Sequence, residues 1–429
     1  MRIFEGLKPM FSMMWKEKLK NHKSLVESFL SLSVLNGLVI LIPLVAMPYV
    51  LRVVGPAHYG LYGFIYILVQ YVLVFNNYGF DYSVTKEVAQ HRQDTAYLNR
   101  VYNAVLGCRL LLFAGVSVVF FALSPLILPT ATHRLMFLGG LTLVLGNTFT
   151  AVWLFQGMEK MRYLTIVNVL GKSVFLLLVF VMIRKPEHYV FLPLLDGLGY
   201  VVCGLASLVI ARVQFGMRLR LPSWADMKAQ FASGAAIFGS TLGMTLYRKS
   251  NIFILRFFVG DAALGLYTAA EKIVMGLQGI VSPVSQALFP YLGHDFVGKP
   301  HRENLQKLKK ISAYMAGLLF LAMAAVFFLA EPLVRILCGQ EFMEATRLLR
   351  IMSPVMFFGG MNYLLGIVGL VNLDKSGKFF RNVLLAGVTS VVWTLCTASF
   401  LGVEAGSWAM TLSETVLFFA CLFGLYRLR

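Results

Sequence analysis

Predominantly apolar runs recur along the whole length of this 429-residue chain. A helical run of about 18 or more such residues is long enough to cross the hydrocarbon core of a bilayer. Only helices and closed barrels cross lipid, because each backbone N–H and C=O must find a partner inside the protein. The ten-residue alternation typical of barrel strands is missing from the sequence. The sequence therefore predicts an all-α polytopic membrane protein.

Composition supports this interpretation, since 58% of the residues are hydrophobic, only 14% are charged and the mean hydropathy is +0.74. A soluble domain of this composition would expose too much apolar surface. The net charge of +18 is high enough to raise the question of nucleic acid. However, the basic residues gather between the apolar segments, as membrane topology requires, so no nucleic-acid partner is predicted.

Twelve apolar segments are predicted as transmembrane helices, each close to the length that a bilayer requires. In the first half they lie at 26–51, 60–80, 101–124, 134–157, 163–183 and 189–211. In the second half they lie at 231–258, 262–292, 311–330, 346–371, 380–401 and 404–426.

The distribution of Lys and Arg predicts the orientation. With the N-terminus inside, 25 of the 38 basic residues fall on the cytoplasmic side, 8 on the opposite side and 5 within spans. Cytoplasmic loops carry an excess of Lys and Arg, so both termini are predicted to be cytoplasmic. Residues 1–25 are predicted to be a basic cytoplasmic segment that flanks an uncleaved first span.

An internal repeat divides the chain. LRVVGPAHYGLY (51–62) aligns with LRFFVGDAALGLY (255–267) with a single-residue gap, so that Arg52 matches Arg256. Six helices in each half place the two halves in the same orientation, as in transporters built from parallel repeats. We expect an N-terminal half over 26–214, a cytoplasmic linker over 215–230 and a C-terminal half over 231–429. Such halves form a V-shaped bundle that works by alternating access.

Ionisable side chains within spans are costly to insert and often mark a transport pathway. The cations are Arg109, Lys172, Arg248, Lys249 and Lys272, and the anions are Asp196, Glu271 and Glu414. Arg248 and Lys249 form the strongest cluster, with Tyr247 and Asn251 as neighbouring hydrogen-bonding groups. A cationic interior suits an anionic cargo. For Lys172 and Arg109, snorkelling to the cytoplasmic surface is an equal alternative.

Catalysis is not predicted. The sequence contains no GxxxxGK[ST], HExxH, GxSxG or CxxC pattern, and the five cysteines are scattered. No cofactor or metal is therefore expected. The 35 Phe and 18 Tyr residues are best explained by helix packing and interfacial belts, with stacking on sugar rings as the alternative.

Four stretches resemble the Wzx-type polysaccharide (O-antigen repeat unit) flippases over essentially the whole chain. They are PYVLRVVGPAHYGLYGF, NNYGFDYSVTKEVA, WLFQGMEKMRYLTIVN and LGLYTAAEKIVMGLQGIVSPVSQALFPYLG. This family belongs to the superfamily that includes the multidrug and toxin extruders and the lipid II flippases. The resemblance implies a bacterial inner-membrane protein that moves an undecaprenyl-pyrophosphate-linked oligosaccharide from the cytoplasmic to the periplasmic leaflet. A polysaccharide polymerase and a chain-length regulator are candidate partners.

On that resemblance, the pyrophosphate would meet Arg248 and Lys249, with Lys272, Lys172, Arg109, Asn251 and Tyr247 as further substrate-binding candidates. Transport would be driven by the membrane potential or by ion antiport. Asp81, Asp196, Glu271 and Glu414 are the candidate ion-coupling sites. The alternatives are a drug extruder of the same fold, a lipid II flippase, and a non-transporting scaffold of a glycan assembly complex. Extruder cargoes are mostly cationic, and lipid II flippases usually carry fourteen spans.

Overall fold

The computed structural model describes residues 23–296, 301–373 and 375–427, with some side chains, chiefly those of 23–41 and 280–291, outside the description. In the first half the elements are α2 (Lys23–Asn77), α3 (Phe80–Gln90), α4 (Thr95–Ile127), α5 (Ala131–Phe149), α6 (Val152–Gly157), α7 (Met161–Met182), η1 (Pro186–Phe191) and α8 (Leu192–Phe215). In the second half they are α9 (Trp224–Leu255), α10 (Asp261–Phe296), α11 (His301–Phe328), α12 (Ala330–Leu337), η2 (Gln340–Phe342), α13 (Ala345–Met352), α14 (Pro354–Asn362), η3 (Tyr363–Val371), α15 (Ser376–Leu401) and α16 (Glu404–Tyr426).

The all-α prediction is confirmed, because the described residues form helices and turns without a strand. Each of the twelve predicted segments falls on helical structure. Within the described part of the chain, nine helices are long and apolar enough to cross a membrane. The predicted number of twelve spans therefore stays a prediction.

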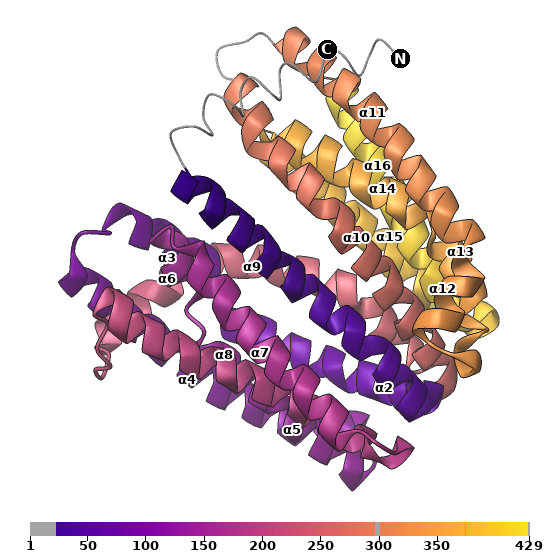
Figure 1. The fold of residues 1–429 in the computed structure, drawn as a ribbon, viewed down its shortest axis with the longest axis horizontal. Helices are drawn as coiled ribbons and strands as arrows, with labels where there is room; N and C mark the ends of the chain where they lie inside the picture. The colour runs from indigo at the N-terminus through magenta and orange to yellow at the C-terminus, as the bar shows by residue number, and fades with distance from the viewer. Residues whose placement is uncertain (1–22, 297–300, 374, 428–429) are drawn as a thin grey trace.

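The first predicted turn lies at a single residue. The chain passes from the first to the second predicted span within α2, where Gly55 has φ 72° and ψ 172°. Only glycine adopts this region without strain, and Pro56 then starts the returning helix with its fixed φ. Figure 1 shows α2 running between the two bundles and reversing at its far end.

The helices form the expected V-shaped pair of bundles (Figure 1). One bundle contains α3–α8 and the returning part of α2, and the other contains α10–α16. Helix α9 connects them, since its beginning contacts the first bundle and its end contacts the second. Gln230 donates to Glu87 on α3 at 3.0 Å, and Asn251 accepts from Thr394 on α15 at 2.9 Å.

The bundles meet where the two repeated motifs cross. A Cβ added to Gly60 would clash with the carbonyl oxygen of Asp261, and one added to Gly265 would clash with the carbonyl oxygen of Pro56. Gly60 and Gly265 are 205 residues apart, as are Pro56 and Asp261, so the contact is reciprocal about an axis between the repeats. The predicted duplication is therefore visible as a symmetric backbone contact, which only glycine permits.

The matched arginines reach across the same contact. Arg52 of the first repeat donates to the carbonyl oxygen of Ile336 in the second bundle. Arg256 of the second repeat lies over the ring of Phe64 on α2, with its guanidinium carbon 5.5 Å from the ring centroid, and pairs with Asp261. Each arginine thus ties its own repeat to the opposite half.

We expect Gly60→Ala and Gly265→Ala to weaken this contact, because the added methyl group meets main-chain atoms that cannot move aside. Overpacking of this kind costs about 1–3 kcal/mol. Thermal unfolding in detergent should show a transition several degrees below that of the unaltered protein. Gly317→Ala is the control, since its Cβ would meet nothing within 4 Å. Equal transition temperatures for all three variants would contradict the close packing described here.

Candidate functional site

A cavity of about 370 Å³ lies between α2, α7 and α8 of the first half and α10 of the second. Its wall combines charged, aromatic and small side chains. The residues that carry its chemistry are Tyr59, Tyr62, Tyr66, Asn168, Lys172, Asp196, Tyr200 and Lys272. The cavity therefore takes residues from both repeats.

Lys272 enters the cavity from α10 and ends among three tyrosines of α2. Its Nζ lies 5.5 Å from the ring centroids of Tyr59 and Tyr62 and 5.4 Å from that of Tyr66. Spacings of three and four residues place these rings on one face of the helix. The ammonium group is therefore held by cation–π attraction to rings of the opposite half.

Lys172 and Asp196 come from neighbouring helices of the first half. Gly171 on α7 and Gly199 on α8 let these helices approach closely, since a Cβ on Gly171 would lie 2.5 Å from the carbonyl oxygen of Gly199. Asp196 interacts electrostatically with both Lys172 and Lys272. Two lysines and one carboxylate give this part of the cavity a cationic balance.

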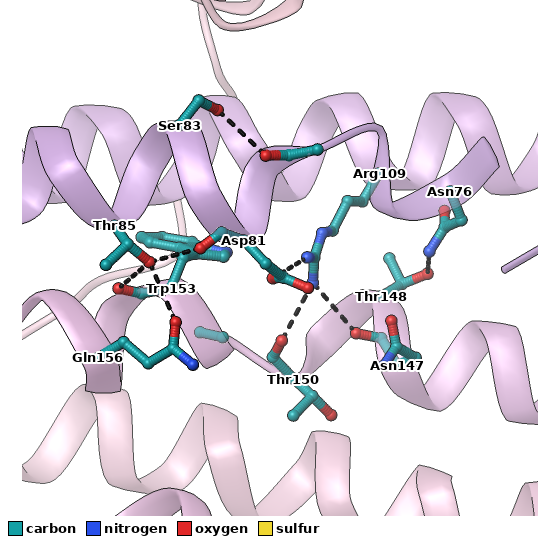
Figure 2. A network of polar contacts seen from close by, with 12 residues as sticks. Asn76, Asp81, Ser83, Thr85, Arg109, Asn147, Thr148, Thr150, Trp153 and Gln156 are labelled. Carbon is teal, nitrogen blue, oxygen red and sulfur yellow. Dashed lines mark hydrogen bonds and ion pairs between the residues drawn. The ribbon is translucent and has the colours of Figure 1, made fainter. Parts of the chain in front are cut away.

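Arg109 and Asp81 form an ion pair outside the cavity (Figure 2). The Arg109 side chain is 1% exposed, and its Nη2 lies 2.6 Å from Oδ1 of Asp81, which is 28% exposed. Nη1 donates to the carbonyl oxygens of Asn147 and Thr150, at 3.3 and 3.0 Å. These carbonyls stand at the C-terminal end of α5, where a cation is favoured.

Lys249 and Glu271 interact electrostatically with each other, which joins two of the predicted site residues. Asn251 is engaged elsewhere, because its Oδ1 accepts hydrogen bonds from Ser390 and Thr394 of α15. The Oε2 of Glu414 accepts from Asn362 at 2.6 Å.

The side chains of Tyr247 and Arg248 lie outside the described residues.

Of the predicted site residues, the cavity brings together Lys272, Lys172 and Asp196. Sequence reasoning missed the tyrosines, which it assigned chiefly to packing. The available signal was their spacing at 59, 62 and 66, which places them on one helical face that begins within the repeated motif. Among the described residues, no group of three or more His, Cys, Asp or Glu side chains could hold a metal ion.

Comparison with known proteins places this arrangement in context. A family model described as "Polysaccharide biosynthesis protein" matches residues 25–294. A relative from Escherichia coli (strain K12), named "Putative O-antigen transporter", is 26% identical over 374 residues, covering 87% of this chain and 89% of the relative. A relative of the same name from Shigella dysenteriae is 23% identical over 407 residues, covering 94% and 99%.

Solved structures share the fold. Lipid II flippase MurJ in an inward closed conformation has a TM-score of 0.77 at 10% identity, covering 92% of this chain and 87% of that chain. An inward-facing multidrug resistance MATE family transporter of the MOP superfamily has a TM-score of 0.72 at 14% identity, covering 92% and 94%. An outward-facing MATE family transporter has a TM-score of 0.60 at 14% identity, covering 93% and 94%.

Apolar helices in two bundles around a shared cavity define the chain as a multi-pass membrane protein with the fold of the MATE transporters and MurJ. The chain belongs to the polysaccharide biosynthesis protein family. The resemblance identified from the sequence is thereby confirmed.

The ion pair of Arg109 yields a stability prediction. Asp81→Asn leaves a buried guanidinium without its carboxylate, and removing one partner of a buried pair costs about 3–5 kcal/mol. We expect a clear fall in the unfolding temperature for Asp81→Asn and for Arg109→Met.

The exposed pair Arg335–Glu331 supplies the control, because surface pairs contribute about 0–1 kcal/mol. Arg335→Ala should therefore unfold close to the unaltered protein. If Arg109→Met kept its stability but lost transport, Arg109 would be a cargo-binding residue instead.

Proposed function

We propose that this protein is a flippase that moves undecaprenyl-pyrophosphate-linked oligosaccharide repeat units across the bacterial inner membrane, from the cytoplasmic to the periplasmic leaflet. The observation that carries the proposal is the cationic, tyrosine-lined cavity shared by the two halves. Membership of the polysaccharide biosynthesis family and similarity to two O-antigen transporter relatives support this class of cargo. The product would feed synthesis of a surface polysaccharide.

The chemistry of the cavity suits the two polar parts of such a cargo. Lys272 and Lys172 supply ammonium groups for the diphosphate. When the glycan is neutral, the diphosphate carries the only fixed charge of the cargo. Tyr62, Tyr66 and Tyr200 offer ring faces and hydroxyl groups to sugars. Lys249 and Arg248 stay candidates for a second cationic position. The polyprenyl chain would remain in lipid between the halves.

The conformation fits the start of the cycle. With both termini in the cytoplasm, the contact between Gly60 and Gly265 lies at the periplasmic end, so the cavity is closed on that side. TM-scores of 0.77 and 0.72 to inward conformations, against 0.60 to an outward-facing one, favour the same state. Export then requires the glycine contact to separate.

The membrane potential supplies part of the driving force. Moving one negative charge out of a cell that is negative inside releases about 2.3 kcal/mol per 100 mV. Among the acidic candidates, Asp81 is paired with Arg109 and Glu414 with Asn362, whereas Asp196 faces the cavity between two lysines. We therefore place ion coupling at Asp196, with Glu271 beside Lys249 as the second choice.

Three alternatives are separated by simple assays. A drug extruder would confer resistance when overproduced, although two lysines in the cavity disfavour cationic drugs. A lipid II flippase would sustain the growth of cells that have been depleted of their own lipid II flippase. A scaffold would fail to move lipid-linked oligosaccharide in liposomes that contain only this protein.

Replacement of the cavity lysines should abolish most transport. Hydrogen bonds to charged groups contribute about 1.5–3 kcal/mol, so Lys272→Met and Lys172→Met should each slow transport of a fluorescent lipid-linked oligosaccharide in proteoliposomes about 10- to 100-fold. Lys86→Met, at an exposed position on α3, is the matched control. Unchanged rates in both cavity variants would refute the proposed anion site.

Asp196→Asn should uncouple transport from an imposed pH gradient, because a side-chain amide does not bind and release a proton as a carboxyl group does. The initial rate in proteoliposomes should then be the same with and without the gradient. Glu414→Gln should keep the dependence, since Glu414 lies outside the cavity and bonds Asn362. A gradient effect that survives in Asp196→Asn but disappears in Glu414→Gln would move the coupling site to the second half.

A further inference from the structure

We propose that Lys272 is a latch that the cargo releases. Its ammonium group holds the two halves together by lying among Tyr59, Tyr62 and Tyr66. A diphosphate in the cavity draws the ammonium away from the rings, and the periplasmic end is then free to open. The identity of the releasing anion rests on the proposed function, whereas the latch itself rests on the geometry alone.

The first support is that the contact crosses between the halves. The three tyrosines belong to the first repeat and Lys272 to the second, and the ammonium lies 5.4–5.5 Å from all three ring centroids. Cation–π attraction becomes stronger as the cation loses contact with water, and Lys272 is partly buried between the helices.

The second support is the position of this contact beside the closed end. Tyr59 directly precedes Gly60, and Lys272 follows Gly265 by seven residues, or about 10 Å along the helix. The glycine crossing brings main chains together, and Arg52 and Arg256 reach across it from the two repeats. Lys272 provides a further side-chain attachment about two helical turns along α10.

The third support is that the same ammonium lines the cavity. An anion there competes directly with the rings, because a full negative charge attracts the ammonium more strongly than a ring quadrupole does. Asp196 on the cavity wall also interacts electrostatically with Lys272, so charges in the cavity act on its ammonium group. An empty transporter therefore stays closed, and a loaded one opens.

The experiment places spin labels on both sides of the closed end. Ala57 and Ala262 are exposed, lie 205 residues apart and flank the crossing, so Ala57→Cys and Ala262→Cys are the labelling sites. Cys396→Ser removes the exposed native cysteine. In proteoliposomes, dipolar broadening between the labels reports the closed state. Undecaprenyl diphosphate is the probe, and undecaprenol, which lacks the phosphates, is its control.

We expect strong broadening in the empty protein, a loss of at least half of it with undecaprenyl diphosphate, and no change with undecaprenol. The triple change of Tyr59, Tyr62 and Tyr66 to Leu should lose the broadening without any ligand. The triple change to Phe should keep it, because the rings remain. Lys272→Gln, a single change that tests the same contact if the triple Leu variant misfolds, should also open without ligand.

Two results would overturn the latch. Broadening that persists in both Lys272→Gln and the triple Leu variant would show that the rings do not hold the halves. If undecaprenyl diphosphate leaves the broadening unchanged while the protein transports lipid-linked oligosaccharide, release of the latch by the cargo is refuted. The proposed function is not affected by that result. Loss of transport in the unaltered protein would instead refute the function, and the ring variants would still decide whether the latch exists.

Discussion

The architecture depends on one contact that contains almost no side chains. Where the repeats cross, Gly60 and Gly265 bring two helical backbones so close that a methyl group on either would overlap the other chain. Because the contact is reciprocal, neither half can shift along the other without losing both sides of it. Arg52 and Arg256 reach across from the two repeats and fix this point further. This contact sets the positions of the cavity and of Lys272 relative to the two halves.

The features that follow from periodicity and repetition could be predicted from the sequence. The apolar segments, the duplication and the turn at Gly55 each have a local cause in residue type and spacing. The candidate site was only partly predictable, because the sequence does not say which face of a span points inward. Lys172, Lys272 and Asp196 line the cavity. Arg109 is as deep in its predicted span, but it pairs with Asp81 and donates to carbonyl oxygens at the end of α5. Tertiary partners, rather than depth in the membrane, separate these roles.

Helix α9 limits how the two bundles can separate. Its first turns contact the first bundle through Gln230, and its last turns contact the second through Asn251. Any separation of the halves at the glycine crossing must therefore bend this helix or carry it with one bundle. The predicted linker, 215–230, overlaps the start of α9 at Trp224, and this helix contacts both halves.

The 205-residue offset relates the tyrosine face to its own counterpart. Tyr59, Tyr62 and Tyr66 correspond to Leu264, Tyr267 and Glu271, and Lys272 corresponds to Ile67. The first copy thus carries all three rings, whereas the second carries one of them, at Tyr267, together with the two charges. In a dimer of two identical subunits, each subunit would have to carry both the rings and the cation. The contact would then form twice, once on each side of the axis. Because both copies lie in one chain, they can differ in sequence, and the symmetric scaffold holds a single, one-sided contact.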